Sequence, residues 1–141
     1  MSILMDMETQ TTQTEMHSHA APTPVHLSDK AAAMVKETIE RLASPAIGAN
    51  IDTSNYVVNK QNPVDAVKLL APYIIYTHLK DARETPDGLK TTYLGNGFIP
   101  IDKIIEALDE TGRTFPLCFE FGGEGDPEGA IAKSIRYLKD L

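Results

Sequence analysis

Hydrophobic residues recur along this chain with two different periods that follow one another. Stretches with an apolar residue at every second position predict strands, and stretches with apolar residues three and four positions apart predict helices. The predicted strands span residues 3–8, 46–52, 73–83 and 115–121. The predicted helices begin near Ser28, Pro63, Asp102 and Asp126. The chain is therefore expected to repeat a strand and a helix four times.

This alternation favours an α/β fold with parallel strands and right-handed crossovers. We expect a single domain over residues 1–141, with four parallel strands in one sheet. Two segments lack both periods. Residues 9–27 are predicted to form a long loop, which could serve as a lid. Residues 84–88 have the residue types of a turn and precede a short extended piece at 91–97.

An ionisable side chain ends each predicted strand, on the face opposite the aliphatic residues of that strand. These side chains are Glu8, Asp52, His78 and Glu120. Because parallel strands end on the same side of a sheet, the four should converge. Crowded carboxylates repel one another, and a divalent cation relieves that repulsion. Three carboxylates and one imidazole form an oxygen-rich ligand set, which favours Mn²⁺, Co²⁺ or Mg²⁺ and differs from the thiolate ligands of many zinc sites. Zn²⁺ is the alternative.

The stretch at 73–83 changes from apolar residues to a dense polar group. Strict alternation along a strand places His78 and Lys80 on the same face as Ile74 and Tyr76. The same alternation turns Leu79 to the other face. The strand should therefore deliver both an imidazole and an ammonium group to the site.

Composition narrows the class of protein. The chain has 141 residues, 42% hydrophobic and 23% charged, which is typical of a globular protein. Its net charge of −7 and the lack of a Lys/Arg cluster argue against a nucleic-acid partner and favour a small molecule. We see no signal-peptide pattern and no apolar run of membrane length, so we expect a cytoplasmic protein without membrane contact.

Five short motifs carry a resemblance to a known family. They are Met7 to Thr9, Ile51 to Asn55, His78 to Asp81, Leu94 to Gly97 and Phe119 to Phe121. On these motifs the chain resembles the C-terminal half of the xylose-isomerase-like TIM-barrel superfamily, which includes sugar phosphate isomerases and epimerases. A full barrel has eight strands and typically about 250 residues. The resemblance therefore implies a parallel (β/α)4 half of a TIM barrel.

The resemblance also implies a role for each polar residue of the site. Glu8, Asp52, His78 and Glu120 would bind the metal, and Glu8 and Glu120 would also move a proton on the sugar. The residues implied to contact the substrate are Glu15, Asn55, Lys80, Asp81 and Arg83. The implied reaction is the isomerisation or epimerisation of a sugar or sugar phosphate through a metal-bound enediolate.

Other interpretations of the same residues stay open. A polyol dehydratase would use much the same parts, whereas an endonuclease-IV-like phosphodiesterase would need a basic surface and more histidines than the sequence has. The length favours a catalytically incomplete half-barrel that binds metal or assembles with a partner. His17 and His19 have a spacing that can chelate a metal, but in a polar loop they are expected to be solvated.

A half-barrel leaves two unpaired sheet edges and one uncovered sheet face. Two copies related by a twofold axis could close an eight-stranded barrel, with all strand ends on one side. We therefore expect either a homodimer or a complementary half-barrel that supplies the other strands.

Overall fold

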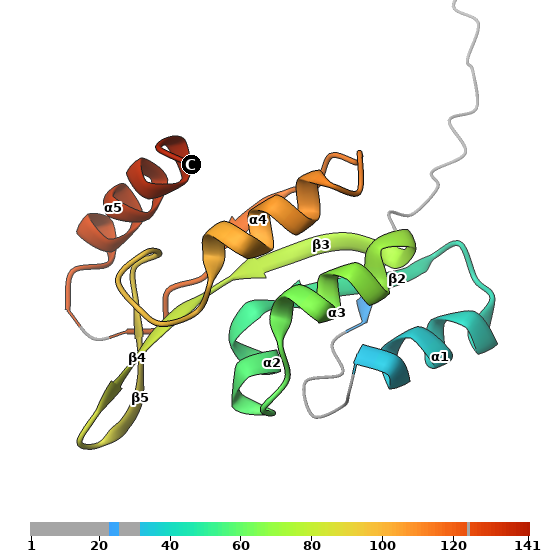
Figure 1. Ribbon diagram of the computed structural model, residues 1–141, viewed down its shortest axis with the longest axis horizontal. Helices are drawn as coiled ribbons and strands as arrows, with labels where there is room; N and C mark the ends of the chain where they lie inside the picture. Colours follow the sequence, from blue (N-terminus) through green and yellow to red (C-terminus); the bar gives the residue numbers. More distant parts are fainter. Residues whose placement is uncertain (1–22, 26–31, 124) are drawn as a thin grey trace, which may run out of the picture.

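The computed structural model describes residues 23–25, 32–123 and 125–141, and its central element is a parallel sheet with strand order β1-β2-β3-β6 (Figure 1). The strands of this sheet are β1 Thr23–Val25, β2 Ile47–Asp52, β3 Ile74–Leu79 and β6 Leu117–Phe119. Neighbouring strands are joined by helical crossovers, as the alternating periods predicted. The expected α/β fold with parallel strands is confirmed.

Helices cover one face of the sheet (Figure 1). The helices of the described ranges are α1 Ala32–Leu42, α2 Thr53–Val58, α3 Pro63–Leu70, α4 Ile101–Asp109 and α5 Pro127–Lys139, with a 3-10 turn at Ala71–Tyr73. α3 lies between α1 and α4 and contacts both. α3 and α5 each begin at a proline, where the missing N–H has no partner to lose, and Asn62 and Asp126 cap them.

The predicted strand at 73–83 is two strands. β3 ends at Leu79, and after Lys80 the chain continues as β4 Asp81–Thr85, which pairs antiparallel with β5 Gly88–Thr92. The turn predicted at 84–88 is therefore the tip of a β-hairpin that projects from the sheet (Figure 1). The extended piece expected at 91–97 begins earlier, at Gly88, and ends at Thr92.

The N-terminal predictions fall largely outside the described residues. The strand expected at residues 3–8 and most of the loop expected at 9–27 lie there. Within that loop range, however, Thr23–Val25 forms β1 and pairs with β2. The loop was expected because residues 9–27 show no periodicity, and Pro24 within β1 has no N–H to donate to a sheet. β1 lies at the edge of the described sheet, where a proline is tolerated.

Ile74 lies on the opposite face of β3 from the one predicted, because the register shifts. The pairing of β2 with β3 is irregular between Ala49 and Asn50. As a result Ile74 is fully buried in the core under the helices, whereas Ile75 packs beside Gly48. The alternation that includes His78 therefore does not extend back to Ile74, because an irregularity in the ladder moves the side chains before it to the other face.

The hydrophobic core lies between the sheet and its helices. Large apolar side chains with no exposed surface are Ile51, Val67, Leu70, Ile74, Leu79, Leu94, Ile101 and Ile104. Each such burial contributes about 1.5–3 kcal/mol relative to an exposed side chain. Among the described residues no helix has the length and apolar character needed to cross a membrane.

Helix α5 buries a different face from the one its periodicity predicted. Ile131, Ile135 and Leu138 were expected to form its apolar stripe. Leu138 packs partly against the core, but Ile131 and Ile135 are exposed. Small buried residues, Ala130 and Ser134, occupy the inner side instead. One apolar face of the last helix is thus left without a neighbour within the described part of the chain.

Candidate metal centre

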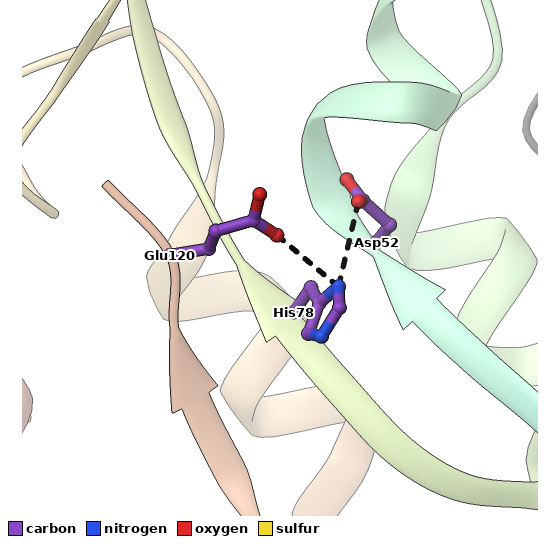
Figure 2. A group of neighbouring side chains, drawn as sticks. All are labelled: Asp52, His78 and Glu120. Carbon is purple, nitrogen blue, oxygen red and sulfur yellow. Dashed lines mark ion pairs between the residues drawn. The ribbon is translucent and has the colours of Figure 1, made fainter. Parts of the chain in front are cut away.

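Three neighbouring strands bring Asp52, His78 and Glu120 together (Figure 2). Asp52 is the last residue of β2 and pairs in register with His78 of β3. His78 in turn pairs with Cys118 of β6, two positions before Glu120. The backbone N–H of Glu120 donates to the Leu79 carbonyl at 3.1 Å, which extends the pairing just beyond β6. The convergence predicted for these three residues is therefore observed.

The donor atoms of this group lie close enough for one ion. One ligand atom from each residue lies within 4.8 Å of the others. The His78 Nδ1 is 3.2 Å from the Glu120 Oε2 and 3.8 Å from the Asp52 Oδ2. The exposed fraction of the side chain rises from 5% for Asp52 to 23% for His78 and 47% for Glu120. The group is thus anchored in the protein at Asp52 and open to solvent at Glu120.

The two oxygens of Asp52 have separate contacts. Oδ1 accepts the backbone N–H of Asn55 at 3.2 Å and the hydroxyl of Ser54 at 3.1 Å, and so caps helix α2. Oδ2 faces His78 and Lys80. Because the cap fixes the carboxylate, its second oxygen is held towards the cluster before any ligand arrives.

Lys80 also belongs to the cluster. Its Nζ is 3.0 Å from the Asp52 Oδ2 and 3.0 Å from the Glu120 Oε2. Burial alone lowers the pKa of Lys80, but the hydrogen bonds and charges of the two carboxylates outweigh it, so the net pKa is raised. The ammonium group therefore stays charged at neutral pH and offsets the repulsion between the carboxylates.

Asn50 also belongs to the site, although it was not predicted to. Asn50 lies two residues before Asp52 on β2 and is buried, and its Nδ2 is 3.3 Å from the His78 Nδ1. The Tyr76 ring packs edge-on against the imidazole at a centroid distance of 5.4 Å. The signal for Asn50 was its position, since residues two apart on a strand share a face.

Tyr56 of α2 lies next to the cluster. Burial, and secondly the charge of Asp52, raise the pKa of its phenol to about 12. This side chain therefore reports on the charge of Asp52 without being a ligand candidate itself.

Asp81 does not belong to this cluster. Its carboxylate is fully buried and accepts the backbone N–H groups of Ala82, Gly95, Gly97 and Ile99 at 2.8–3.2 Å. Any Cβ at Gly97 would overlap this carboxylate, so the loop needs glycine there. The burial does not fit the expected contact between Asp81 and a substrate. Instead, Asp81 holds the loop after the hairpin in place.

The remaining expected substrate residues lie in different places. Asn55 is half-buried in the first turn of α2, beside the Asp52 cap. Arg83 is exposed on β4, on the hairpin that follows Lys80. Glu8, expected as a metal ligand and catalytic residue, and Glu15 lie outside the described residues.

Three solved structures with this architecture are each larger than the chain. A probable 3-DHS dehydratase involved in petrobactin synthesis, from Bacillus anthracis, superposes with a TM-score of 0.68 and 19% identity, over 84% of this chain and 48% of its own. D-allulose 3-epimerase from Methylomonas sp., in complex with D-allulose, superposes with a TM-score of 0.65 and 14% identity, over 78% of this chain and 42% of its own. A xylose isomerase-like TIM barrel protein from Mycobacterium smegmatis, in complex with magnesium, superposes with a TM-score of 0.63 and 24% identity, over 76% of this chain and 38% of its own.

These identities establish the fold alone, and the chain spans less than half the length of each of these structures. A comparison with curated proteins finds no match. The sequence model of one family matches residues 13–141, nearly the whole chain. The chain belongs to the xylose isomerase-like TIM barrel family.

Proposed function

We propose that this chain carries the metal-binding half of the active site of a sugar, or sugar phosphate, isomerase or epimerase. One observation carries the proposal: Asp52, His78 and Glu120 converge at the carboxyl ends of three adjacent parallel strands. In barrels of this type the catalytic groups lie at that end of the strands. Glu8, from the strand expected at residues 3–8, would be the fourth ligand.

The residues present fit a divalent cation. Two carboxylate oxygens and one imidazole nitrogen lie within 4.8 Å of one another, and such a set suits Mn²⁺, Co²⁺, Mg²⁺ or Zn²⁺. Asp52 is fixed by its helix cap, so little side-chain freedom is lost on binding. When bound, the ion would polarise a ketose carbonyl and its neighbouring hydroxyl.

The residues of the chain itself would bind the sugar and move the proton. Glu120 is the most exposed member of the cluster, so it can reach a C–H next to a bound carbonyl and act as a base. Glu8 would return the proton from the opposite side in an epimerisation. Lys80, which already bridges two carboxylates, would hold a substrate hydroxyl, and Asn55 would line the same mouth.

A closed barrel would require further strands, and we propose that a second copy of the chain supplies them. Apolar residues at the β6 end of the sheet support this proposal, because they are exposed within the described part of the chain: Leu117, Ile131 and Ile135. A complementary half-barrel is the alternative. Light scattering on the full chain distinguishes the homodimer from the complementary half-barrel. A homodimer has twice the chain mass, whereas a stable monomer would contradict self-assembly.

A dehydratase acting on a polyol is the second candidate. The similarity of fold to the probable 3-DHS dehydratase favours it, although at 19% identity this likeness concerns the fold. The same carboxylate base next to a carbonyl would start either reaction, and only the fate of the neighbouring hydroxyl differs. Product analysis separates them: epimerisation keeps the substrate mass, whereas dehydration lowers it by one water.

The test is a metal titration of the full chain, followed by an epimerisation screen with ketoses and ketose phosphates. Mn²⁺, Co²⁺, Mg²⁺ and Zn²⁺ are compared on wild type, Asp52→Asn and the control Glu106→Gln, whose carboxylate lies on the exposed side of α4. We expect the wild type and the control to bind alike and Asp52→Asn to bind more weakly. Failure of the wild type to bind any of these ions would overturn the proposal.

A further inference from the structure

The hairpin of β4 and β5 places two positive charges opposite each other. Arg83 and Lys90 are direct partners in the antiparallel ladder, so their side chains share one face of the hairpin. Like charges in this position destabilise a hairpin unless something of opposite sign lies between or beside them. Neither side chain forms an ion pair with any residue of the described ranges, in contrast to Lys80.

A hollow of about 390 Å³ lies at this face of the hairpin. Its lining is mainly polar and includes Arg83, Thr85, Lys90, Thr91, Gly122 and Gly123, with Asp87 at the hairpin tip. A second hollow of about 230 Å³ shares Arg83 and Thr91 and adds Lys133 and the Asp126 cap. Among the described residues that line the two hollows, three carry a positive charge and two a carboxylate, in a chain whose net charge is −7.

The glycine segment after Glu120 forms the other wall. A Cβ at Gly123 would lie 2.7 Å from the Phe121 ring and 3.0 Å from the Thr91 carbonyl oxygen, so this residue packs tightly against β5. A Cβ at Gly122, by contrast, would meet no atom of the described residues within 4 Å. The loop is therefore held against the hairpin at Gly123 and leaves open space at Gly122.

The walls of the hollow are close along the chain to the metal centre. Gly122 is two residues beyond Glu120, and Arg83 is three residues beyond Lys80. An extended chain advances at most about 3.6 Å per residue, so these links place the wall residues within roughly 7 Å and 11 Å of the cluster backbone. One small molecule can span that distance.

We propose that Arg83, Lys90 and the Gly122–Gly123 segment bind an oxyanion substituent, a phosphate or a carboxylate, of the substrate. Guanidinium and ammonium groups form charge-assisted hydrogen bonds with such groups, and an open glycine backbone allows close approach. The hollow thus selects an anionic sugar derivative over a neutral sugar. This inference rests on the proposed function for the identity of the sugar, but the anion site itself can be tested without it.

The experiment measures the binding of inorganic phosphate and, separately, of acetate to the full chain by chemical-shift titration. The variants are Arg83→Gln, Lys90→Gln and both together. Arg41→Gln is the matched control, because Arg41 is an exposed arginine on α1 with the same change in net charge. We expect each single variant to lose about 5- to 20-fold in affinity for the preferred anion, the double variant more, and the control nothing.

The outcomes separate this inference from the proposed function. Tighter binding of phosphate than of acetate supports a sugar phosphate, and the reverse order supports a sugar acid. Equal affinities in wild type, Arg83→Gln and Lys90→Gln, or no binding of either anion, would overturn the anion site. Mn²⁺ titration of the same variants should be unchanged. If Mn²⁺ fails to bind while phosphate binds and both variants weaken it, the anion site stands and the metal-dependent function fails.

Discussion

Two buried aspartates at the carboxyl end of the sheet have opposite surroundings. Asp81 accepts four backbone N–H groups and has no exposed surface. Asp52 gives one oxygen to a helix cap and turns the other towards His78 and Lys80. Asp52 is the last residue of β2, and Asp81 follows the end of β3 by two residues. Only Asp52 faces groups that a ligand could replace.

The difference shows what makes a buried carboxylate structural or functional. Backbone N–H groups cannot move away without unfolding the loop, so the partners of Asp81 are permanent. The partners of Asp52 are side chains that can rotate, and one of them is a cation whose place a metal ion could take. Burial alone therefore does not identify a site, whereas the nature of the partners does.

The largest effect is expected for Asp81→Asn, which should lower the free energy of unfolding by about 3–5 kcal/mol. The amide NH₂ would face backbone donors that the carboxylate accepts, and buried N–H groups would lose their partners. Urea unfolding measures this, with Asp52→Asn as the comparison. A loss under about 1 kcal/mol would show that the Asp81 contacts are not structural.

Asp52→Asn should have a small effect on stability and a large effect on metal binding. Asparagine caps helices as well as aspartate does, so the cost in stability should stay below about 1 kcal/mol. Affinity for Mn²⁺ should fall by about 100-fold, because a charged and pre-positioned ligand is lost. Isothermal titration of both variants checks the contrast. Unchanged Mn²⁺ affinity in Asp52→Asn would contradict the role of Asp52 in metal binding.

Tyr56 should report the charge of Asp52 at high pH. With the pKa of its phenol raised to about 12, the folded chain keeps a proton that the unfolded chain loses above pH 10. The unfolded state then binds fewer protons, so stability falls as pH rises from 10 to 12, by up to about 2 kcal/mol.

The measurement is the difference in unfolding free energy between wild type and Tyr56→Phe across that window. This difference cancels the contribution of Lys80, whose raised pKa acts in the same direction. Asp52→Asn should reduce the fall, since the Asp52 charge is the second cause of the raised pKa. An identical pH profile in Asp52→Asn would contradict that coupling.

The smallest effect is expected for Lys80→Met. The ammonium lies 3.0 Å from an oxygen of each carboxylate, so it competes with a metal ion for the same charges. Its removal should tighten Mn²⁺ binding by about 3- to 10-fold, opposite in sign to Asp52→Asn. The control Lys103→Met removes an exposed lysine that pairs with Glu106 on α4 and should change nothing. Weaker binding in Lys80→Met would show that the lysine supports the site instead of competing for it.

Much of the fold and three members of the site could be predicted from local pattern. Alternating apolar residues ending in a polar side chain are sufficient to place Asp52, His78 and Glu120 at strand ends, and parallel strands bring those ends together. Asn50 was not predicted, because its one signal, a position two residues before Asp52 on the same face of β2, is shared by every strand residue with that spacing. Helix α2 was missed because its six residues are too few to show a helical period.

The errors have a common physical origin in long-range contacts. The burial of Asp81 depends on the backbone N–H groups of Gly95 and Gly97, which reach its carboxylate only in the folded chain. The register shift that buries Ile74 depends on β2. In α5, Ala130 and Ser134 are buried in place of Ile131 and Ile135, as only the packing of the whole chain decides. None of these contacts leaves a periodic signal in the segment that it affects.

The most direct test of the central claim is Mn²⁺-induced broadening of histidine ring signals in the NMR spectrum of the full chain, with signals assigned by single His→Asn variants. The sequence offers two competing metal sites, His78 with its carboxylates and the His17–His19 pair. At substoichiometric Mn²⁺ we predict that the His78 ring signals broaden first, and that Glu120→Gln abolishes this effect. Broadening of His17 and His19 while the His78 signals stay sharp would contradict the claim.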